Sequence, residues 1–295
     1  EMLIEFSVKN FLSFKDKVTL SMEKGNGDEN LDNVISANNF ALLKICAIYG
    51  ANASGKSNIL KALTCAILMV KNSSLIPVGG KWTFIKPFLF AEDSKNKPSE
   101  FEFIFIANDV KYRYYFTADA NRIYDEVLDA YYSQKPTNIF TRTKTNVYEF
   151  NNDKNKLESL STNNTENKMI LSTATTWNYE KTKDAYLWFT SSINTYSSLN
   201  NIEDKDLIDY SSGEENLKEF ALKLLKEADI LIKDITVDYE EKEMDSTMID
   251  MLVPPFAKNS EKFKVKNVNI ELEHEIMDSN NDVHTYKLNF VDESS

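Results

Sequence analysis

The chain has 295 residues and is 42% hydrophobic and 12% aromatic, so it can build the core of one large domain or of two smaller ones. Its formal net charge of −12 argues against a general nucleic-acid-binding surface, although it does not exclude a local patch. There is no signal peptide and no run of about 18 apolar residues, so we expect a cytoplasmic protein with no membrane partner.

The chain has two cysteines and two histidines, too few and too scattered to suggest a metal centre or a disulfide framework. We expect Cys46 and Cys65 to be buried small apolar residues. His274 and His284 stand alone, so no zinc site is predicted.

The N-terminal part of the chain predicts two strands and a loop. Residues 3–8 alternate apolar and polar side chains, which is the pattern of a half-buried strand, and residues 18–22 predict a second, short strand. Residues 25–39 are polar and contain Gly, Asn and Asp, which predicts a loop.

A buried strand and a helix are predicted next. Residues 42–49 are apolar except for Lys44, which is typical of a buried parallel strand. Residues 57–71 have helical periodicity, with four apolar side chains expected on one face: Leu60, Leu63, Ile67 and Val70.

The residues between this strand and this helix fit the phosphate-binding pattern G-x-x-x-x-G-K-[ST]. They read Gly50-Ala51-Asn52-Ala53-Ser54-Gly55-Lys56-Ser57. The two glycines permit backbone angles that turn the N–H groups of the loop inward as an anion nest, and the helix that follows adds free N–H donors. The residues predicted to bind the phosphates of ATP are Gly50, Ala51, Asn52, Ala53, Ser54, Gly55, Lys56, Ser57 and Asn58.

Two side chains carry the predicted chemistry of this loop. Lys56 is expected to reach the β- and γ-phosphates, which makes it the candidate catalytic residue, and the Ser57 hydroxyl is expected to ligate Mg²⁺. The predicted cofactors are therefore ATP and Mg²⁺. The alternative is an ordinary glycine turn with a solvated Lys56, which the order of strand, loop and helix disfavours.

An antiparallel β meander is predicted after a loop at residues 73–81. Residues 101–116 are typical of a hairpin that turns at Asn108-Asp109. Further strands are expected at residues 122–132, 138–143 and 146–150. The density of aromatic residues suggests a surface for nucleic-acid stacking, but the packing of half-buried strands is the favoured interpretation.

The rest of the chain alternates between helical and strand patterns. The expected elements, in order, are a loop or weak helix at 151–168, helices at 183–193 and 213–232, a strand at 234–239, an acidic loop at 240–262, and a hairpin of residues 263–276 and 283–291.

The opening residues resemble those of a known family. Residues 4–14, Ile4-Glu5-Phe6-Ser7-Val8-Lys9-Asn10-Phe11-Leu12-Ser13-Phe14, resemble the first strand of RecF- and SMC-type ATPases, which ends in N-F-x-S-F. Together with residues 49–58, they are similar to the group of ABC-type ATPases that includes RloA-like proteins and the OLD nucleases. Residues 97–102 and 110–114 fit the RloA-like branch.

This resemblance implies an α/β fold, namely the P-loop NTPase head of an ABC ATPase with a mixed sheet, an inserted antiparallel β meander and a helical subdomain. The expected division of the chain has four parts. These are N-terminal strands and P-loop core at 1–72, an antiparallel β subdomain at 73–150, a helical insert at 151–262, and a returning hairpin at 263–295 that leads to the signature motif.

The last residues also resemble this family. Glu293, Ser294 and Ser295 match the start of an E-S-S-G-T signature, which one subunit of an ABC-type dimer contributes to the ATP site of the other. The resemblance implies that the chain is the N-terminal part of a longer ATPase whose Walker B residues follow it. We therefore do not expect this part alone to hydrolyse ATP.

Three further stretches depart from the pattern of this family. Residues 84–88 contain no glutamine where the family has its Q-loop, and Leu12 stands where arginine is common. The acidic residues at 237–241 lack the apolar run of a Walker B strand, so they are expected to be a solvated strand end.

The functional hypothesis is an ATP-binding ABC-type ATPase that acts as an ATP-dependent dimeric switch or sensor in a bacterial anti-phage defence system. The implied partners are a second copy of the chain, or a higher homo-oligomer, and an effector nuclease. The defence role rests on resemblance alone. The alternatives are a RecF/SMC-like DNA-repair ATPase that binds DNA and a non-hydrolysing, nucleotide-bound scaffold.

Overall fold

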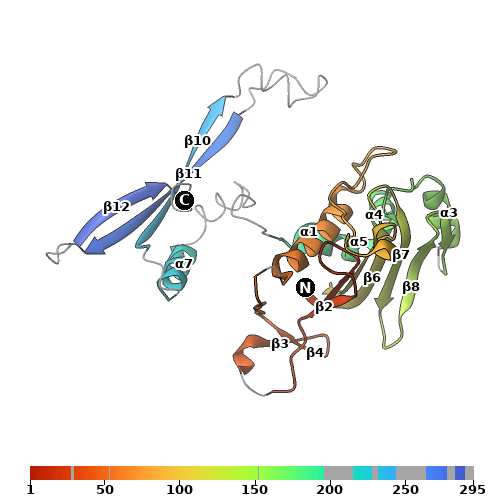
Figure 1. Ribbon diagram of the computed structural model, residues 1–295, viewed down its shortest axis with the longest axis horizontal. Helices are drawn as coiled ribbons and strands as arrows, with labels where there is room; N and C mark the ends of the chain where they lie inside the picture. The colour runs from red at the N-terminus through yellow and green to blue at the C-terminus, as the bar shows by residue number, and fades with distance from the viewer. Residues whose placement is uncertain are drawn as a thin grey trace. The chain divides into compact units, whose positions relative to one another are not determined.

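The structure is a computed structural model (Figure 1), and its described residues fall into two compact units, Glu1–Ser197 and Ser198–Ser295. The loop residue Ala53 and the expected signature start at Glu293, Ser294 and Ser295 lie outside the described residues. The described residues are 1–27, 30–52, 54–151, 153–195, 215–227, 232–243, 264–277 and 283–289.

A seven-stranded antiparallel sheet forms the centre of the first unit, with the strand order β2-β1-β5-β6-β7-β8-β9. The meander expected after the P-loop helix is confirmed, and β1 continues it by pairing with β5. The strands are β1 Met2–Lys9, β2 Val18–Ser21, β5 Ser99–Ala107, β6 Val110–Ala118, β7 Ile123–Tyr131, β8 Thr137–Thr143 and β9 Val147–Glu149. The first two expected parts of the chain thus share one sheet, and the four-part division stays a prediction.

The β5–β6 hairpin turns where the sequence predicts it. Asn108 and Asp109 have φ values of 47° and 60°, the left-handed pair of a two-residue hairpin turn. Asn and Asp tolerate these angles better than other residues with a side chain, because their short polar groups bond to the nearby backbone. The turn fixes the register, which places Phe103 opposite Tyr114.

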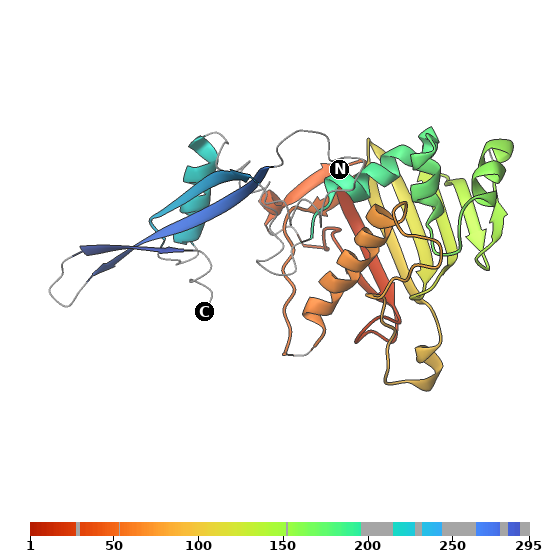
Figure 2. The same cartoon turned by 90° about the horizontal axis from the view of Figure 1, so that it is seen from above.

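Helices cover one face of this sheet (Figure 2). They are α1 Lys56–Asn72, α3 Lys154–Thr162, α4 Ile170–Thr176 and α5 Glu180–Leu187 with the π-helical turn Trp188–Ser192, while the short α2 Glu92–Lys95 lies before β5. The aromatic side chains that alternate along β5 and β6 point into this layer and are almost completely buried: Phe101, Phe103, Phe105, Tyr112, Tyr114 and Phe116. Their packing interpretation is confirmed, because buried rings cannot stack on nucleic acid.

A buried carboxylate fastens α4 to the sheet. Glu126 of β7 is 0% exposed and accepts hydrogen bonds from the N–H groups of Ile170 (2.8 Å) and Leu171 (3.0 Å) at the start of α4. The Tyr114 hydroxyl donates a third hydrogen bond (2.8 Å), and burial raises the pKa of Tyr114, so this hydroxyl keeps its proton. Arg142, also 0% exposed, places Nη1 3.7 Å from Glu126 Oε2. Glu126 therefore serves as the helix cap that α4 does not carry in its own sequence.

The same segment holds the C-terminal end of α1. The Ser172 hydroxyl donates to the carbonyl of Val70 (2.8 Å), and the N–H of Met169 donates to the Ser73 hydroxyl (2.7 Å). A chain of direct contacts thus runs from Glu126 through the start of α4 to the last turn of α1.

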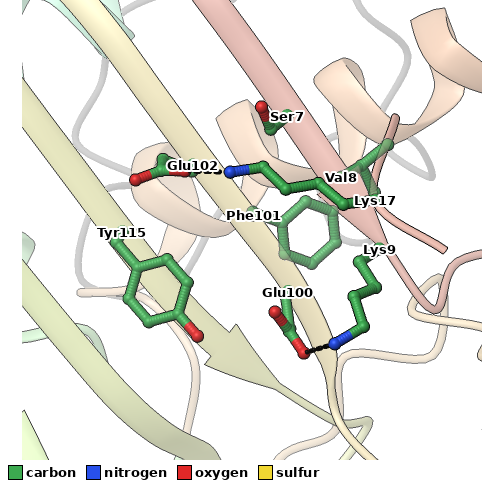
Figure 3. Close-up of a pocket in the computed structure, with 8 residues that line it drawn as sticks. All are labelled: Ser7, Val8, Lys9, Lys17, Glu100, Phe101, Glu102 and Tyr115. Carbon is green, nitrogen blue, oxygen red and sulfur yellow. Dashed lines mark hydrogen bonds and ion pairs between the residues drawn. The ribbon is translucent and has the colours of Figure 1, made fainter. Parts of the chain in front are cut away.

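The opposite face of the sheet carries ion pairs. Glu102 bonds Lys17 (2.6 Å) and Arg113 (2.7 Å), and Lys9 bonds Glu100 (2.8 Å), as Figure 3 shows for both lysine pairs. Burial alone raises the pKa of Glu102, but its bonds to Lys17 and Arg113 outweigh burial and hold this pKa below its usual value. The cavity between these side chains measures about 20 Å³, which is room for a water molecule and no larger ligand.

The strand expected at residues 42–49 is not present, which corrects the sequence interpretation. β4 spans Phe40–Leu43 and pairs antiparallel with β3 Val34–Ala37. β3 lies within residues 25–39, where a loop was expected. Beyond β4, Asn33 exchanges side-chain hydrogen bonds with the N–H and carbonyl of Ile45, and no described strand lies beside this run. An apolar run forms a strand only where another strand can pair with it.

The expected burial of residues 45–49, including Cys46, and the expected mixed sheet are wrong as well, because the strand at residues 42–49 is not present. Ile45 is 73% and Tyr49 90% exposed, and Cys46 is exposed, whereas Cys65 is buried as expected. A mixed sheet was also expected, but every strand pair among the described residues is antiparallel.

The second unit contains a helix and a three-stranded antiparallel sheet with the order β10-β11-β12. Its elements are α7 Glu215–Glu227, β10 Asp234–Glu243, β11 Lys264–Met277 and β12 Val283–Asn289, which confirms the predicted helix and hairpin. Lys218 of α7 bonds Asp234 of β10 (2.7 Å). Asp238, in the acidic run expected to be a strand end, is an exposed residue of β10. No helix in the described part of the chain is long and apolar enough to cross a membrane.

Candidate nucleotide-binding site

The glycine-rich loop ends where α1 begins, as the sequence predicts. Gly55 has φ 96° and precedes the first helical residue, Lys56. Its carbonyl accepts hydrogen bonds from the N–H groups of Asn58 (2.8 Å) and Ile59 (3.3 Å). Lys56 and Ser57 are the first residues of α1 and lie at the positive end of the helix dipole, where backbone N–H groups are suited to binding an anion.

Lys56 folds back over the loop. Its ammonium donates hydrogen bonds to the carbonyls of Gly50 (2.6 Å) and Ala51 (2.8 Å). This places the positive charge at the loop and disfavours the alternative in which Lys56 is an ordinary solvated side chain. A phosphate bound here competes with these carbonyls for the same ammonium.

The other predicted site residues surround this charge. Ser57, at the second position of α1, is exposed, so its hydroxyl is accessible from solution. Asn52 and Ser54 are exposed loop residues, while Asn58 is half-buried. Leu60 is exposed rather than part of the apolar face of α1, and Ile59 lies on that buried face instead.

The opening N-F-x-S-F motif supports the loop. Ser13 Oγ accepts a hydrogen bond from Asn58 Nδ2 (2.8 Å), and Gly55 lies against the side chains of Ser13 and Phe14. The two motifs, about 40 positions apart in the chain, are therefore in direct contact. Sequence reasoning used this motif for family resemblance only and missed its physical role.

Asn10 organises the turn that carries this motif. It has φ 53°, and its side-chain amide donates to the carbonyls of Ser94 (3.0 Å) and Lys97 (2.9 Å). Its side-chain oxygen accepts from the N–H of Phe88 (3.1 Å). One buried asparagine thus joins the turn beneath the P-loop to residues 88–97, and its place in the motif was the available signal.

Gly55→Ala is expected to destabilise the loop more than Gly50→Ala. A methyl group at position 55 would lie 3.0 Å from Ser13 Oγ and 3.1 Å from the Phe14 ring, at a φ that side chains rarely adopt. The expected cost is about 1–3 kcal/mol of unfolding free energy. At position 50 the methyl meets the rotatable hydroxyl of Ser54 at 2.8 Å, without a positive φ. Chemical denaturation of both variants measures the difference, and equal losses would contradict this account.

A cavity of about 220 Å³ opens beside the loop. Its walls are largely apolar and come from β2, the loop and the run before it: Phe14, Val18, Thr19, Leu20, Ile48, Tyr49, Ser54, Gly55, Lys56 and Ile59. None of these residues is acidic. The cavity therefore combines an apolar wall with a cationic end, which suits a flat apolar group attached to phosphates.

A glycine loop that opens a helix, with a lysine folded over the loop, is the arrangement of a P-loop protein. A family model described as "AAA domain, putative AbiEii toxin, Type IV TA system" matches residues 45–289. The chain belongs to this family, which confirms the predicted P-loop ATPase class. A search of curated proteins found no match.

Proposed function

We propose that the protein binds Mg²⁺·ATP at residues 50–58. The observation that carries this proposal is the position of the Lys56 ammonium, which donates hydrogen bonds to the carbonyls of Gly50 and Ala51 in the loop that precedes α1. The triphosphate lies at the start of α1, where Lys56 moves from the loop carbonyls to the β- and γ-phosphates. The exposed Ser57 hydroxyl fits the role of a magnesium ligand, and the ion, when bound, neutralises phosphate charge.

The apolar cavity beside the loop holds the nucleobase in this proposal. Phe14, Val18 and Ile48 supply apolar surface, and the Thr19 hydroxyl is one of the few polar groups. Apolar burial favours the binding of a base, whereas the phosphate contacts of the loop supply most of the orientation.

Hydrolysis, in this proposal, takes place in an assembly. No acidic side chain is among the described residues that line the nucleotide cavity, and in this proposal a general base for water comes from outside this cavity or from a second copy. Two exposed apolar residues support assembly: Phe90 is 92% and Leu89 60% exposed, in the segment that Asn10 ties to the P-loop turn. We propose a homodimer or higher homo-oligomer that ATP stabilises.

The biological setting is a defence system with a second protein component. The family description, which names a toxin of a type IV toxin–antitoxin system, supports such a pairing. We propose that the protein is an ATP-dependent switch of the RloA-like branch in anti-phage defence and that its partner is an effector nuclease. A nucleotide-bound scaffold without turnover is the second candidate, because the cavity lacks an acidic side chain.

The test compares Ser57→Ala with Thr64→Ala by calorimetric titration of ATP, with Mg²⁺ and with EDTA. Ser57→Ala is expected to lower the affinity for Mg²⁺·ATP about 10-fold and to leave metal-free ATP binding unchanged, since one metal ligand is lost. Thr64→Ala is the matched control, because it removes a hydroxyl from the same helix outside the loop and the cavity and should change neither affinity.

Several outcomes decide between the candidates. No ATP binding by the wild-type protein would contradict the nucleotide site, and identical titrations for Ser57→Ala and wild type would contradict the metal role of Ser57. Phosphate release by the full protein separates a switch with turnover from a scaffold. Light scattering with and without ATP tests the ATP-dependent assembly.

A further inference from the structure

A second cavity, which contains no P-loop residue, lies where three hairpin turns meet. Its volume is about 600 Å³, within the range of about 300–1,000 Å³ that is usual for small-ligand sites. We call it the hairpin-tip cavity, and its lining residues are Asn38, Asn39, Phe40, Asp109, Val110, Lys111, Tyr131, Tyr132, Ser133 and Gln134. Loops gathered at one end of a rigid sheet are a common location for binding sites.

The turns that form this cavity are held together. Asn38, in the β3–β4 turn, donates a side-chain hydrogen bond to the carbonyl of Asp109 in the β5–β6 turn (3.1 Å). Asn108 of the same turn bonds Asp184 of α5 (3.2 Å). These bonds fix the first two turns relative to each other and to the helical layer, so the cavity is built on ordered backbone.

Lys111 distinguishes the cavity from the rest of this sheet face. Its ammonium lies 3.8 Å from the ring centre of Tyr131 and 5.4 Å from that of Phe40. Arg113, two residues along the same strand, pairs with Glu102 and Asp129. Lys111 has no carboxylate partner in the described part of the chain, because its cross-strand neighbours are Ile106 and Tyr131. Its positive charge is thus held by aromatic rings and remains available to an anion.

The remaining lining groups can form hydrogen bonds. The side-chain amides of Asn39 and Gln134 have no hydrogen-bond partner among the residues that the structure describes, and both residues are exposed. Tyr132 is 56% exposed and offers a ring surface, while the carboxylate of Asp109 is an acceptor. Amides and a carboxylate can form hydrogen bonds with the donors and acceptors on the edge of a base, and aromatic rings can stack on its face.

We infer that the hairpin-tip cavity binds a nucleobase that carries a phosphate. The base stacks on an aromatic ring, the amides and Asp109 bind its edge, and Lys111 binds the phosphate. An acidic peptide fits less well, because its several carboxylates would share the single cation Lys111, and it has no base for the amides and the aromatic rings to bind. The shared chemistry occurs in free nucleotides and in single-stranded nucleic acid, and the inference does not rest on ATP binding at the P-loop.

The test measures two probes on the full chain carrying Lys56→Ala, so that the P-loop contributes little. A fluorescein-labelled single-stranded DNA 10-mer is followed by anisotropy, and AMP and CMP are titrated by calorimetry. Lys111→Gln and Tyr132→Ala are expected to weaken binding about 10-fold or more, since the first removes the cation for the phosphate and stacking on one aromatic side chain contributes about 5- to 150-fold. Lys135→Gln is the matched control, because Lys135 is an exposed lysine of the same β7–β8 loop outside the cavity.

The two probes separate the sources of the ligand. Loss of 10-mer binding in Lys111→Gln, but not in Lys135→Gln, supports a single-stranded nucleic acid. The same pattern with AMP or CMP alone supports a free nucleotide. Lys111→Gln nearly keeps the size of the side chain, so it still tests the inference if Tyr132→Ala lowers the melting temperature. The inference is overturned by the absence of binding in both arms, or by equal losses in Lys111→Gln and Lys135→Gln.

Discussion

Replacing Glu126 with alanine is expected to lower the free energy of unfolding of the protein by about 3–5 kcal/mol, because the change leaves a buried charge without its partner. Arg142 is 0% exposed, and its Nη1 lies 3.7 Å from the Glu126 carboxylate. The change also removes the acceptor for the N–H groups of Ile170 and Leu171 and for the hydroxyl of Tyr114. Urea denaturation followed by tryptophan fluorescence measures the loss.

Two further variants test the origin of this effect. Glu100→Ala breaks the exposed ion pair with Lys9 and should cost less than about 1 kcal/mol, since solvent screens such pairs. Glu126→Gln keeps one side-chain oxygen as an acceptor for the start of α4 and should therefore cost less than Glu126→Ala. A loss below about 1 kcal/mol for Glu126→Ala alone would contradict the role of Glu126 as the support of α4.

Lys56→Ala is expected to lower the affinity for ATP by about 10- to 150-fold and to leave the fold intact. Hydrogen bonds to charged groups contribute about 1.5–3 kcal/mol each, and this ammonium is the cation of the loop. In the variant, only backbone N–H groups and the metal remain to hold the phosphates. Calorimetric titration of ATP measures the affinity, and thermal melting of the free protein checks the fold.

Lys61→Ala provides the matched control for this prediction. Lys61 is an exposed residue of the same helix, so its removal changes the net charge equally without touching the loop. Its ATP affinity should stay within about 2-fold of wild type, since exposed charges at some distance are screened by salt. Similar losses in both variants would show that general electrostatics, rather than the loop lysine, governs binding.

The elements that could be predicted are those whose cause is local. Alternating side chains define β1, β5 and β6, the Asn108-Asp109 pair defines a turn, and the glycine pattern defines the start of α1. In each case the residues that determine the structure lie within the element itself.

The elements that could not be predicted depend on distant residues. α4 has the sequence Ile-Leu-Ser-Thr-Ala-Thr-Thr, with three threonines that disfavour a helix, and its N-terminus is capped by Glu126 from a strand more than 40 positions earlier. β3 lies in the stretch 25–39 that was expected to be a loop, although the Asn38-Asn39 pair between two short apolar segments indicates a hairpin turn. The strand expected at residues 42–49 was wrong because the apolar character of a segment does not indicate whether a neighbouring strand is present to pair with it.

Part of the candidate site could likewise be predicted from local sequence, and part of it depends on distant residues. The loop and Lys56 follow from the motif, whereas the supporting contacts of Asn10 and Ser13 require the fold. The hairpin-tip cavity has no sequence signature, because its lining residues come from three turns spread between positions 38 and 134.

The exposed run at residues 45–49 affects how the protein behaves at high concentration. Ile-Cys-Ala-Ile-Tyr is uncharged, rich in strand-forming residues and free of proline, which is the composition of segments that pair between chains. The exposed thiol of Cys46 lies inside it, so we expect oxidation in air to cross-link two copies wherever this run pairs between chains. Reducing agent and nucleotide are therefore sensible additions to every purification buffer, and Cys46→Ser is a practical variant for structural work.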